Sequence, residues 1–127
     1  MKLKYGHMLS LACFMLFLAV ALGAFGAHGL KELVTGKYLE TYKTGVTYHF
    51  YHSFALLILP IIGKTFNINV RGSFYFFIAG IILFSFNCYL YAILQVKTFA
   101  MIVPLGGFSF LIGWLMLALT TLKTSEG

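Results

Sequence analysis

The sequence has very few charged residues. Of its 127 residues, 9% are charged and 61% are hydrophobic, and the mean hydropathy is +0.93. A soluble domain carries about a quarter charged residues, which it needs in order to present a surface that water solvates. Because this chain lacks them, lipid must cover its surface instead. The composition therefore excludes a soluble domain and predicts an integral membrane protein.

Acidic residues are the rarer of the two charged kinds. Glu32, Glu40 and Glu126 stand against nine Lys and Arg, which leaves a net charge of +6. The basic residues occur singly at the ends of apolar segments, where their side chains reach anionic lipid headgroups. We therefore expect membrane lipid as a partner and no nucleic acid. The chain also lacks paired carboxylates, a nucleophile beside a base and a phosphate-binding glycine loop, so we expect no enzyme activity and no cofactor.

Cysteine is scarce as well. Cys13 and Cys88 both fall inside apolar segments, and we expect them in opposite leaflets of the membrane. A disulfide needs Cα atoms within about 7 Å of each other. We therefore interpret both cysteines as packing residues.

Long apolar runs are what the sequence has in place of charge. A spanning helix needs roughly 20 mostly apolar residues, and four such segments use nearly the whole chain. The expected helices are at about 7–27, 45–63, 72–94 and 100–122. The connections at 64–71 and 95–99 are short, which favours antiparallel neighbours. The predicted fold is a single all-α transmembrane domain over 1–127, an antiparallel bundle of four transmembrane helices.

The first apolar run has a second interpretation. Lys2 and Lys4 precede it, and Ala19-Val20-Ala21 resembles the cleavage site of a secretory signal peptide. Because the run is long enough to span a membrane, we expect it to remain as the first helix.

Residues 28–44 are neither a span nor a simple turn. Leu30, Leu33 and Val34 recur at helical spacing beside basic and acidic residues, which predicts a short interfacial segment between the first two helices. An ordered loop is the alternative. From Tyr38 onwards, the chain can also continue as helix into the second span.

The basic residues divide between the two ends of the predicted bundle. We call the end that holds both termini side A and the other end side B. Side A has Lys2, Lys4, Lys64, Arg71 and Lys123, and side B has Lys31, Lys37, Lys43 and Lys97. This excess of one favours both termini in the cytoplasm.

Small residues are spaced so that helices can approach closely. Ala19, Gly23 and Ala27 recur every four residues, as do Ser109 and Gly113. Lipid supplies no hydrophobic drive for helices to associate, so close backbone contact matters in a membrane. The predicted helix-packing residues are Ala19, Gly23, Gly26, Ala27, Gly106, Gly107 and Gly113.

Polar residues gather toward side B. His28 ends the first expected helix there, His49 and His52 lie near the start of the second, and Asn87 lies near the end of the third. The two histidines of the second helix are three residues apart and can hold a metal or pass protons. An ionisable residue in a membrane is a functional-site hypothesis. The candidate ligand-binding residues are therefore His28, His49, His52 and Asn87.

Structural roles are the alternative for the same residues. A neutral histidine can bond a carbonyl or a neighbouring helix, and Asn87 can join helices. A structural metal normally needs four ligands, and Cys88 is the one thiol at a matching depth, so the identity of any metal stays unknown. Haem is disfavoured, because two histidines on one helix cannot bind both faces of the ring. We expect Tyr89, Tyr91 and Trp114 to serve as interfacial or packing aromatics.

Three motifs resemble one protein family. They are Gly23-Ala24-Phe25-Gly26-Ala27-His28-Gly29-Leu30, Tyr48-His49-Phe50-Tyr51-His52-Ser53, and Pro104-Leu105-Gly106-Gly107 followed by Gly113-Trp114. In order and over essentially the whole chain, they resemble the bacterial inner-membrane proteins of the domain-of-unknown-function 423 family, which includes YgdD-like proteins. Transmembrane protein 256 of animals is similar. The resemblance implies a four-helix protein of the bacterial cytoplasmic (inner) membrane, and it brings no established activity or site residue.

The chain departs from the family pattern in the third helix. Phe86 stands where the family has a small glycine, so looser helix packing is expected there. Carried over residue by residue, the matching polar positions are His28, His52 and Ser85. Glutamine is also expected at the position of His49, which weakens any mechanism that needs two histidines on the second helix.

Two functions follow from these observations. The favoured one is a non-enzymatic structural or accessory protein that self-associates or docks to a larger membrane complex. The alternative is a binder or carrier of a metal, haem, lipid or proton at a histidine-containing pocket near side B. A channel would require an oligomer, because four helices leave no room for a pore.

Overall fold

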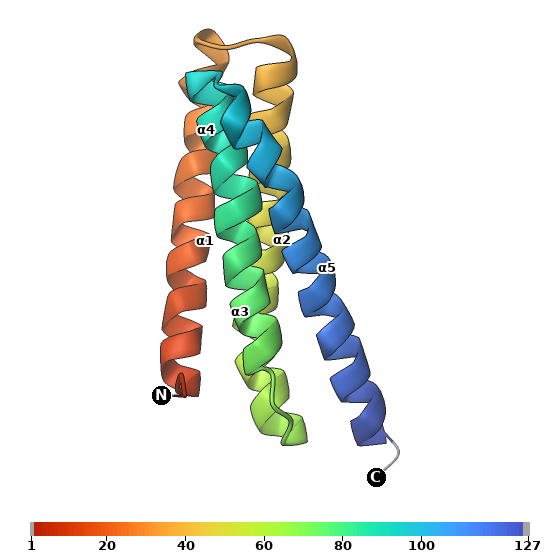
Figure 1. Ribbon diagram of the computed structural model, residues 1–127. Coiled ribbons are helices and arrows are strands. Elements are labelled where there is room, and N and C mark those ends of the chain that lie inside the picture. The colour runs from red at the N-terminus through yellow and green to blue at the C-terminus, as the bar shows by residue number, and fades with distance from the viewer. Residues whose placement is uncertain (1, 126–127) are drawn as a thin grey trace.

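The computed structural model of this chain describes residues 2–125. Within that range, four helical segments are long and apolar enough to cross a membrane (Figure 1). The elements in chain order are α1 (Tyr5–His28), η1 (Leu30–Glu32), α2 (Gly36–Phe66), α3 (Arg71–Gly80), η2 (Ile81–Phe86), α4 (Asn87–Leu94) and α5 (Lys97–Ser125). The prediction of an all-α membrane protein with four spans is confirmed.

The segment between the first two spans is present but shorter than expected. It contains a single 3₁₀ turn, η1, and α2 already begins at Gly36, so helix runs through Tyr38 into the second span without a break. Gly36 has a φ of +61°, a left-handed conformation that glycine adopts without a steric cost. The expected start near residue 45 is therefore wrong by more than two helical turns.

Left-handed residues also end two of the helices. Asn67 follows α2 with a φ of 52°, and Gln95 follows α4 with a φ of 58°. Each residue reverses the chain within a short connection, as is common at helix C-termini. Consecutive spans are consequently antiparallel, and the two ends of the described chain lie at the same end of the bundle (Figure 1).

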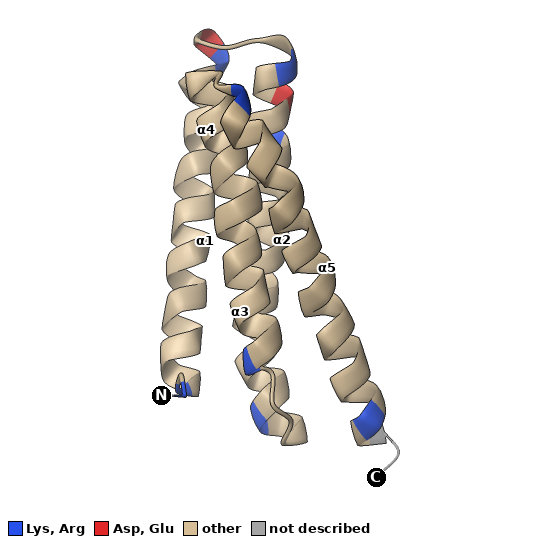
Figure 2. Ribbon diagram, viewed as in Figure 1, with Lys and Arg blue, Asp and Glu red and all other residues tan. Residues whose placement is uncertain are grey.

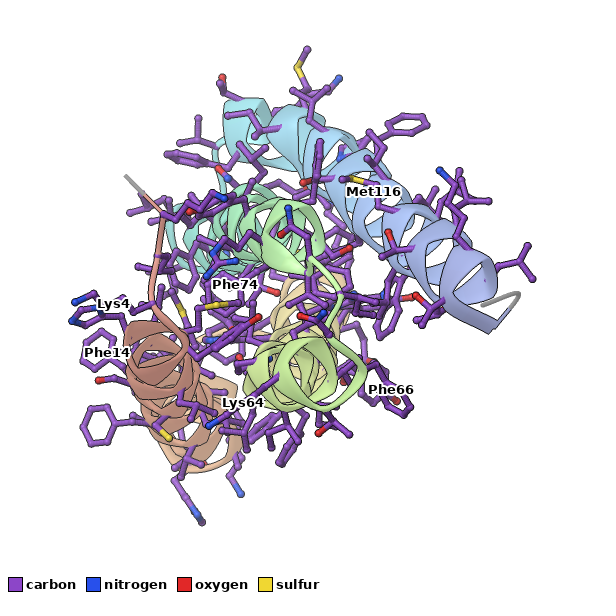
Figure 3. The ribbon with its side chains drawn as sticks, turned by 90° about the horizontal axis from the view of Figure 1, so that it is seen from below. Lys4, Phe14, Lys64, Phe66, Phe74 and Met116 are labelled. Carbon is purple, nitrogen blue, oxygen red and sulfur yellow. The ribbon has the colours of Figure 1, made fainter. Side chains whose placement is uncertain are left out.

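The bundle is arranged as a row more than as a closed square. α1 packs on α2, α2 packs on the third span (α3, η2 and α4), and α5 packs on the other side of that span. Seen from below in Figure 3, α5 lies beside α3 and apart from the end of α2. The central core lies between α1, α2 and the third span and includes Met8, Ala12, Leu56, Leu59, Phe74, Phe77 and Ile81.

The charged residues mark the two ends of the bundle. Figure 2 shows Lys and Arg at both ends and uncharged helix between them, as the sequence predicts. At side A, Arg71 Nε donates a hydrogen bond of 2.9 Å to the Leu3 carbonyl, and its guanidinium lies 5.2 Å from the centre of the Tyr5 ring. This contact attaches the start of α1 to the start of α3.

Candidate functional site

His52 of α2 contacts two side chains of α5. Its Nδ1 lies 2.8 Å from the Tyr48 carbonyl, and Trp114 Nε1 donates a hydrogen bond of 3.0 Å to its Nε2. A carbonyl can only accept and an indole N–H can only donate, so His52 is neutral and carries its proton on Nδ1. Its ring stacks on Phe110 at a centroid distance of 3.5 Å. Both ring nitrogens are therefore occupied by the protein itself.

A groove lies beside this hydrogen bond, on the seam between α2 and α5. Its volume is about 600 Å³, and it opens on the outside of the bundle. The aromatic residues that line it are Tyr48, Tyr51, Phe84, Phe108, Phe110 and Trp114. A second hollow of about 420 Å³, between Phe66 and Thr124, continues the same seam toward side A. The seam between these two helices is thus open on both sides of the His52–Trp114 bond.

Two tyrosine hydroxyl groups belong to the groove. Tyr48 and Tyr51 line it and are 40% and 62% exposed. Within residues 2–125, neither hydroxyl takes part in a hydrogen bond. Each can donate one hydrogen bond and accept another. The groove therefore combines apolar walls with polar groups that are available to a ligand.

His49 has different neighbours from His52. Its Nδ1 lies 2.8 Å from the Tyr89 hydroxyl, and its ring meets the edge of Phe86 at a centroid distance of 5.6 Å. The ring is fully buried, and its Nε2 has no hydrogen-bond partner in the described part of the chain. His49 therefore faces the third span, whereas His52 faces α5. The two rings, three residues apart on α2, therefore contact two different helical segments.

Asn87 is occupied within its own helix. Its side-chain amide donates to the carbonyls of Ile82 and Leu83 at 3.1 and 3.0 Å. These carbonyls belong to η2, a π-helical stretch in which the backbone bonds run from residue i to residue i+5. Asn87 therefore gives the two carbonyls a side-chain donor. The expected third span is continuous, although its turns at 81–86 are π-helical, and the bonds of the Asn87 amide stay within that span.

The four predicted ligand-binding residues do not converge. His28 is exposed at the end of α1, and the other three face different neighbours, as described above. Among the described residues, no group of three or more His, Cys, Asp or Glu is placed to hold a metal ion. Ligand binding at these four positions stays a prediction, and the groove offers a better-formed site.

Most of the predicted packing residues lie at contacts inside the chain. Ala19 is fully buried, and Gly23 lies near Val46. Gly26 packs on the ring of Tyr42, Gly106 on the backbone of η2, and Gly113 on Phe77. Ala27 is exposed, and Gly107 lines the groove, where a β carbon would make only an ordinary contact with Phe84.

One close contact was missed in the sequence. A β carbon on Gly45 would lie 2.8 Å from Cys88 Cβ and 3.1 Å from the Ser85 carbonyl, so only glycine lets α2 approach the third span there. Phe86 does not prevent this approach, because Gly45 supplies the small residue from the other helix. Gly45 is the first residue of the predicted second span, and a small residue at that position was the available signal.

The family now follows from comparison with known proteins. The family described as "Protein of unknown function (DUF423)" matches residues 22–107. The chain belongs to this family. The matched stretch includes the first two motifs and Pro104-Leu105-Gly106-Gly107, and it includes most of the groove.

Its relatives are described as membrane proteins. "UPF0382 membrane protein SAB0533" of Staphylococcus aureus is 43% identical over 106 residues, which are 84% of this chain and 87% of the relative. "UPF0382 membrane protein YwdK" of Bacillus subtilis is 41% identical over 108 residues, 84% of this chain and 88% of the relative. No solved structure matches the chain. This DUF423 member is thus a membrane protein of an uncharacterised family.

Proposed function

We propose that this protein is a non-enzymatic membrane protein that binds a neutral amphiphile in the groove between α2 and α5. The observation that carries the proposal is the combination of aromatic walls with the hydrogen-bonding hydroxyls of Tyr48 and Tyr51. The ligand's head would accept or donate hydrogen bonds at these hydroxyls. Its apolar tail would lie along the seam toward side A.

The size of the groove favours a small molecule. Small-molecule sites have volumes of about 300–1,000 Å³, a range that includes this groove. A helix with its side chains is about 10–12 Å wide, and one additional helix would need a larger and longer surface. A groove of this volume can hold an aliphatic chain or a flat ring.

The position of the groove favours a head without charge. Tyr48 lies five residues beyond Lys43, which is about 8 Å deeper along the helix axis. The described residues that line the groove include no Lys, Arg, Asp or Glu. A phosphate would lack a counter-charge at that depth, because charged groups are costly within the hydrocarbon layer. A carbonyl or hydroxyl head matches the two tyrosines.

Trp114 makes the proposal testable by fluorescence. It is the single tryptophan of the chain, and it lines the groove. In bilayers, increasing amounts of a brominated monoacylglycerol should quench its fluorescence with saturation at a low mole fraction. Brominated phosphatidylcholine should quench it weakly and in proportion to its concentration.

Gly107→Leu is the matched test of the location. A side chain at Gly107 would extend into the groove, and its β carbon has only an ordinary contact with Phe84. This variant should raise the half-saturating monoacylglycerol fraction by about tenfold or more, which corresponds to about 1.4 kcal/mol. Gly6→Leu, where a β carbon meets open space, is the control and should bind normally. Quenching that does not saturate and is equal in the wild type, Gly107→Leu and Gly6→Leu would contradict the proposal.

Self-association or docking to a membrane complex stays the competing prediction. The small residues that suggested it mostly pack within the chain, as described above. Native mass spectrometry of the same samples separates the two functions. A stable dimer whose formation Gly107→Leu abolishes would assign the groove to a second copy and would contradict the amphiphile.

We also infer the membrane and the orientation. The bacterial relatives are named as membrane proteins, which supports the bacterial cytoplasmic membrane. Side A holds both ends of the described chain and one more basic residue than side B. By the positive-inside rule, this excess supports cytoplasmic termini.

A further inference from the structure

The interior of the bundle contains a cluster of polar atoms that the groove does not use. Among residues 2–125, the buried side-chain atoms without a hydrogen-bond partner are His49 Nε2, Ser53 Oγ and Ser85 Oγ. All three residues are 0% exposed. Buried polar groups without a partner are uncommon, because their removal from water is costly. Surrounding lipid cannot replace the missing partner in a membrane.

Helix contacts place Ser85 on the face that meets α2. A β carbon on Gly45 of α2 would lie 3.1 Å from the Ser85 carbonyl and 2.8 Å from Cys88 Cβ. The backbones of the two helices are therefore in close contact at this level. Ser85 belongs to η2, so it lies in the π-helical stretch of the third span.

The antiparallel register brings the other two residues to the same place. His49 lies one turn beyond Gly45 on α2 and contacts the Tyr89 hydroxyl. Gly45 lies beside Cys88 and Tyr89 of the third span. Ser85 lies one turn before Tyr89, and His49 lies one turn after Gly45. Because the two helices are antiparallel, both steps lead toward side A, so Ser85 is level with His49. Ser53 follows His49 by four residues on the same face of α2. The three residues thus lie on the facing surfaces of α2 and the third span, within about one helical turn along the bundle axis.

The serines behave differently from the hydroxyl residues on the surface of the bundle. Thr41 and Thr44 of α2 donate to the carbonyls four residues before them, as hydroxyl side chains in helices commonly do. Ser53 and Ser85 make no such bond. Their hydroxyl groups are therefore available to a partner between the helices.

α1 closes the cluster on its third side. The Met15 backbone lies near the His49 ring, although outside hydrogen-bond geometry for Nε2. Ala12 and Ala19, one turn on either side of Met15, are fully buried. Lipid therefore does not reach the cluster, and any partner of its polar atoms must be small and internal.

We propose that His49, Ser53 and Ser85 form an internal binding site for water. A water molecule donates two hydrogen bonds and accepts two, so it can bond one histidine nitrogen and two hydroxyls in either direction. Conserved buried waters typically have about three such partners. The site is separate from the amphiphile groove, because His52 and not His49 lines the groove.

The test uses the intact protein in bilayers with ¹⁵N-labelled histidine. Solid-state NMR with magnetisation transfer from water should give a strong signal at the ring of His49. His52 is the control within the same molecule, since both of its nitrogens already have protein partners. A His49→Gln variant assigns the signal. Equal or absent transfer to both rings would overturn the proposal.

Ser85→Ala should change the thermal midpoint in opposite directions, depending on whether the Ser85 hydroxyl bonds a water or is unpaired. If Ser85 holds the water, its removal should lower the thermal midpoint and reduce the water signal at His49. If its hydroxyl is an unpaired buried group, its removal should leave the midpoint unchanged or raise it, and that result would contradict the site. Unfolding can be followed by a thiol dye at buried Cys88 in a Cys13→Ala background. Thr120→Ala, which removes a hydroxyl bonded to its own helix, is the control for the substitution.

Discussion

Trp114 donates its indole N–H to His52 across the seam between α2 and α5, at 3.0 Å. The bond leaves His52 in one tautomer, because Nε2 accepts from the indole while the Nδ1–H donates to the Tyr48 carbonyl. It also joins two helices whose seam is open on both sides. Trp114 is 45% exposed, yet through this bond it is part of the tertiary structure, which agrees with the packing role expected for it.

Trp114→Phe should destabilise the protein by about 1 kcal/mol, since hydrogen bonds between transmembrane helices contribute about 0.6 kcal/mol on average and up to about 1.7. His52→Phe should cost a similar amount. The double variant should cost less than the sum, because the shared bond can be lost only once. Reversible unfolding in mixed micelles measures the four free energies. Strict additivity would show that the two side chains do not interact.

Gly106 and Gly107 are adjacent, yet alanine should have opposite effects at the two positions. A β carbon on Gly106 would overlap the backbone of Phe84 in η2, so Gly106→Ala should destabilise by about 1–3 kcal/mol through overpacking. Gly107 has room for a β carbon. Gly107→Ala should therefore be neutral or stabilising by up to about 1 kcal/mol, the difference in helix propensity. The same unfolding assay measures both, and each variant controls for the other.

Asn87→Leu should weaken the third span. Leucine has a similar volume but no amide, so the carbonyls of Ile82 and Leu83 lose their donor inside the π-helical stretch. Leaving a buried acceptor without a partner costs about 1–3 kcal/mol. Unfolding free energies measure the loss. Leu90→Ala, on the lipid-facing side of the same helix, is the control and should cost less. Equal costs would show that Asn87 does not support η2.

The spans and the side of each connection could be predicted from the sequence. Apolar length and isolated basic residues identify a membrane helix without any knowledge of its neighbours. The early start of α2 was harder to predict, because Lys37, Glu40 and Lys43 are charged. These residues lie on an exposed part of the helix at side B, where Lys43 pairs with Glu40 at 3.5 Å. Polarity therefore ended the predicted span but not the helix.

The candidate site could be predicted only in part. His49, His52 and Asn87 were identified as unusual, yet their partners depend on how each helix is rotated, and rotation is set by contacts between helices. The π-helical stretch changes the rotation of the third span after Gly80, and no local sequence signal marks it. The groove residues Tyr48 and Tyr51 resemble ordinary interfacial aromatics. Tyr48 and Tyr51 become candidate ligand-binding residues only because the structure shows a groove beside them.

The orientation of the protein can be tested with single cysteines. In a Cys13→Ala, Cys88→Ala background, Lys37→Cys at side B should react with a membrane-impermeant maleimide in intact bacterial cells. Lys123→Cys at side A should react only after the membrane is permeabilised. This result is expected because five basic residues at side A, against four at side B, should retain that side in the cytoplasm. The excess is only one residue, so adding two lysines next to Lys37 should invert or mix the labelling. Labelling of Lys123→Cys, and not of Lys37→Cys, in intact cells would place the termini outside.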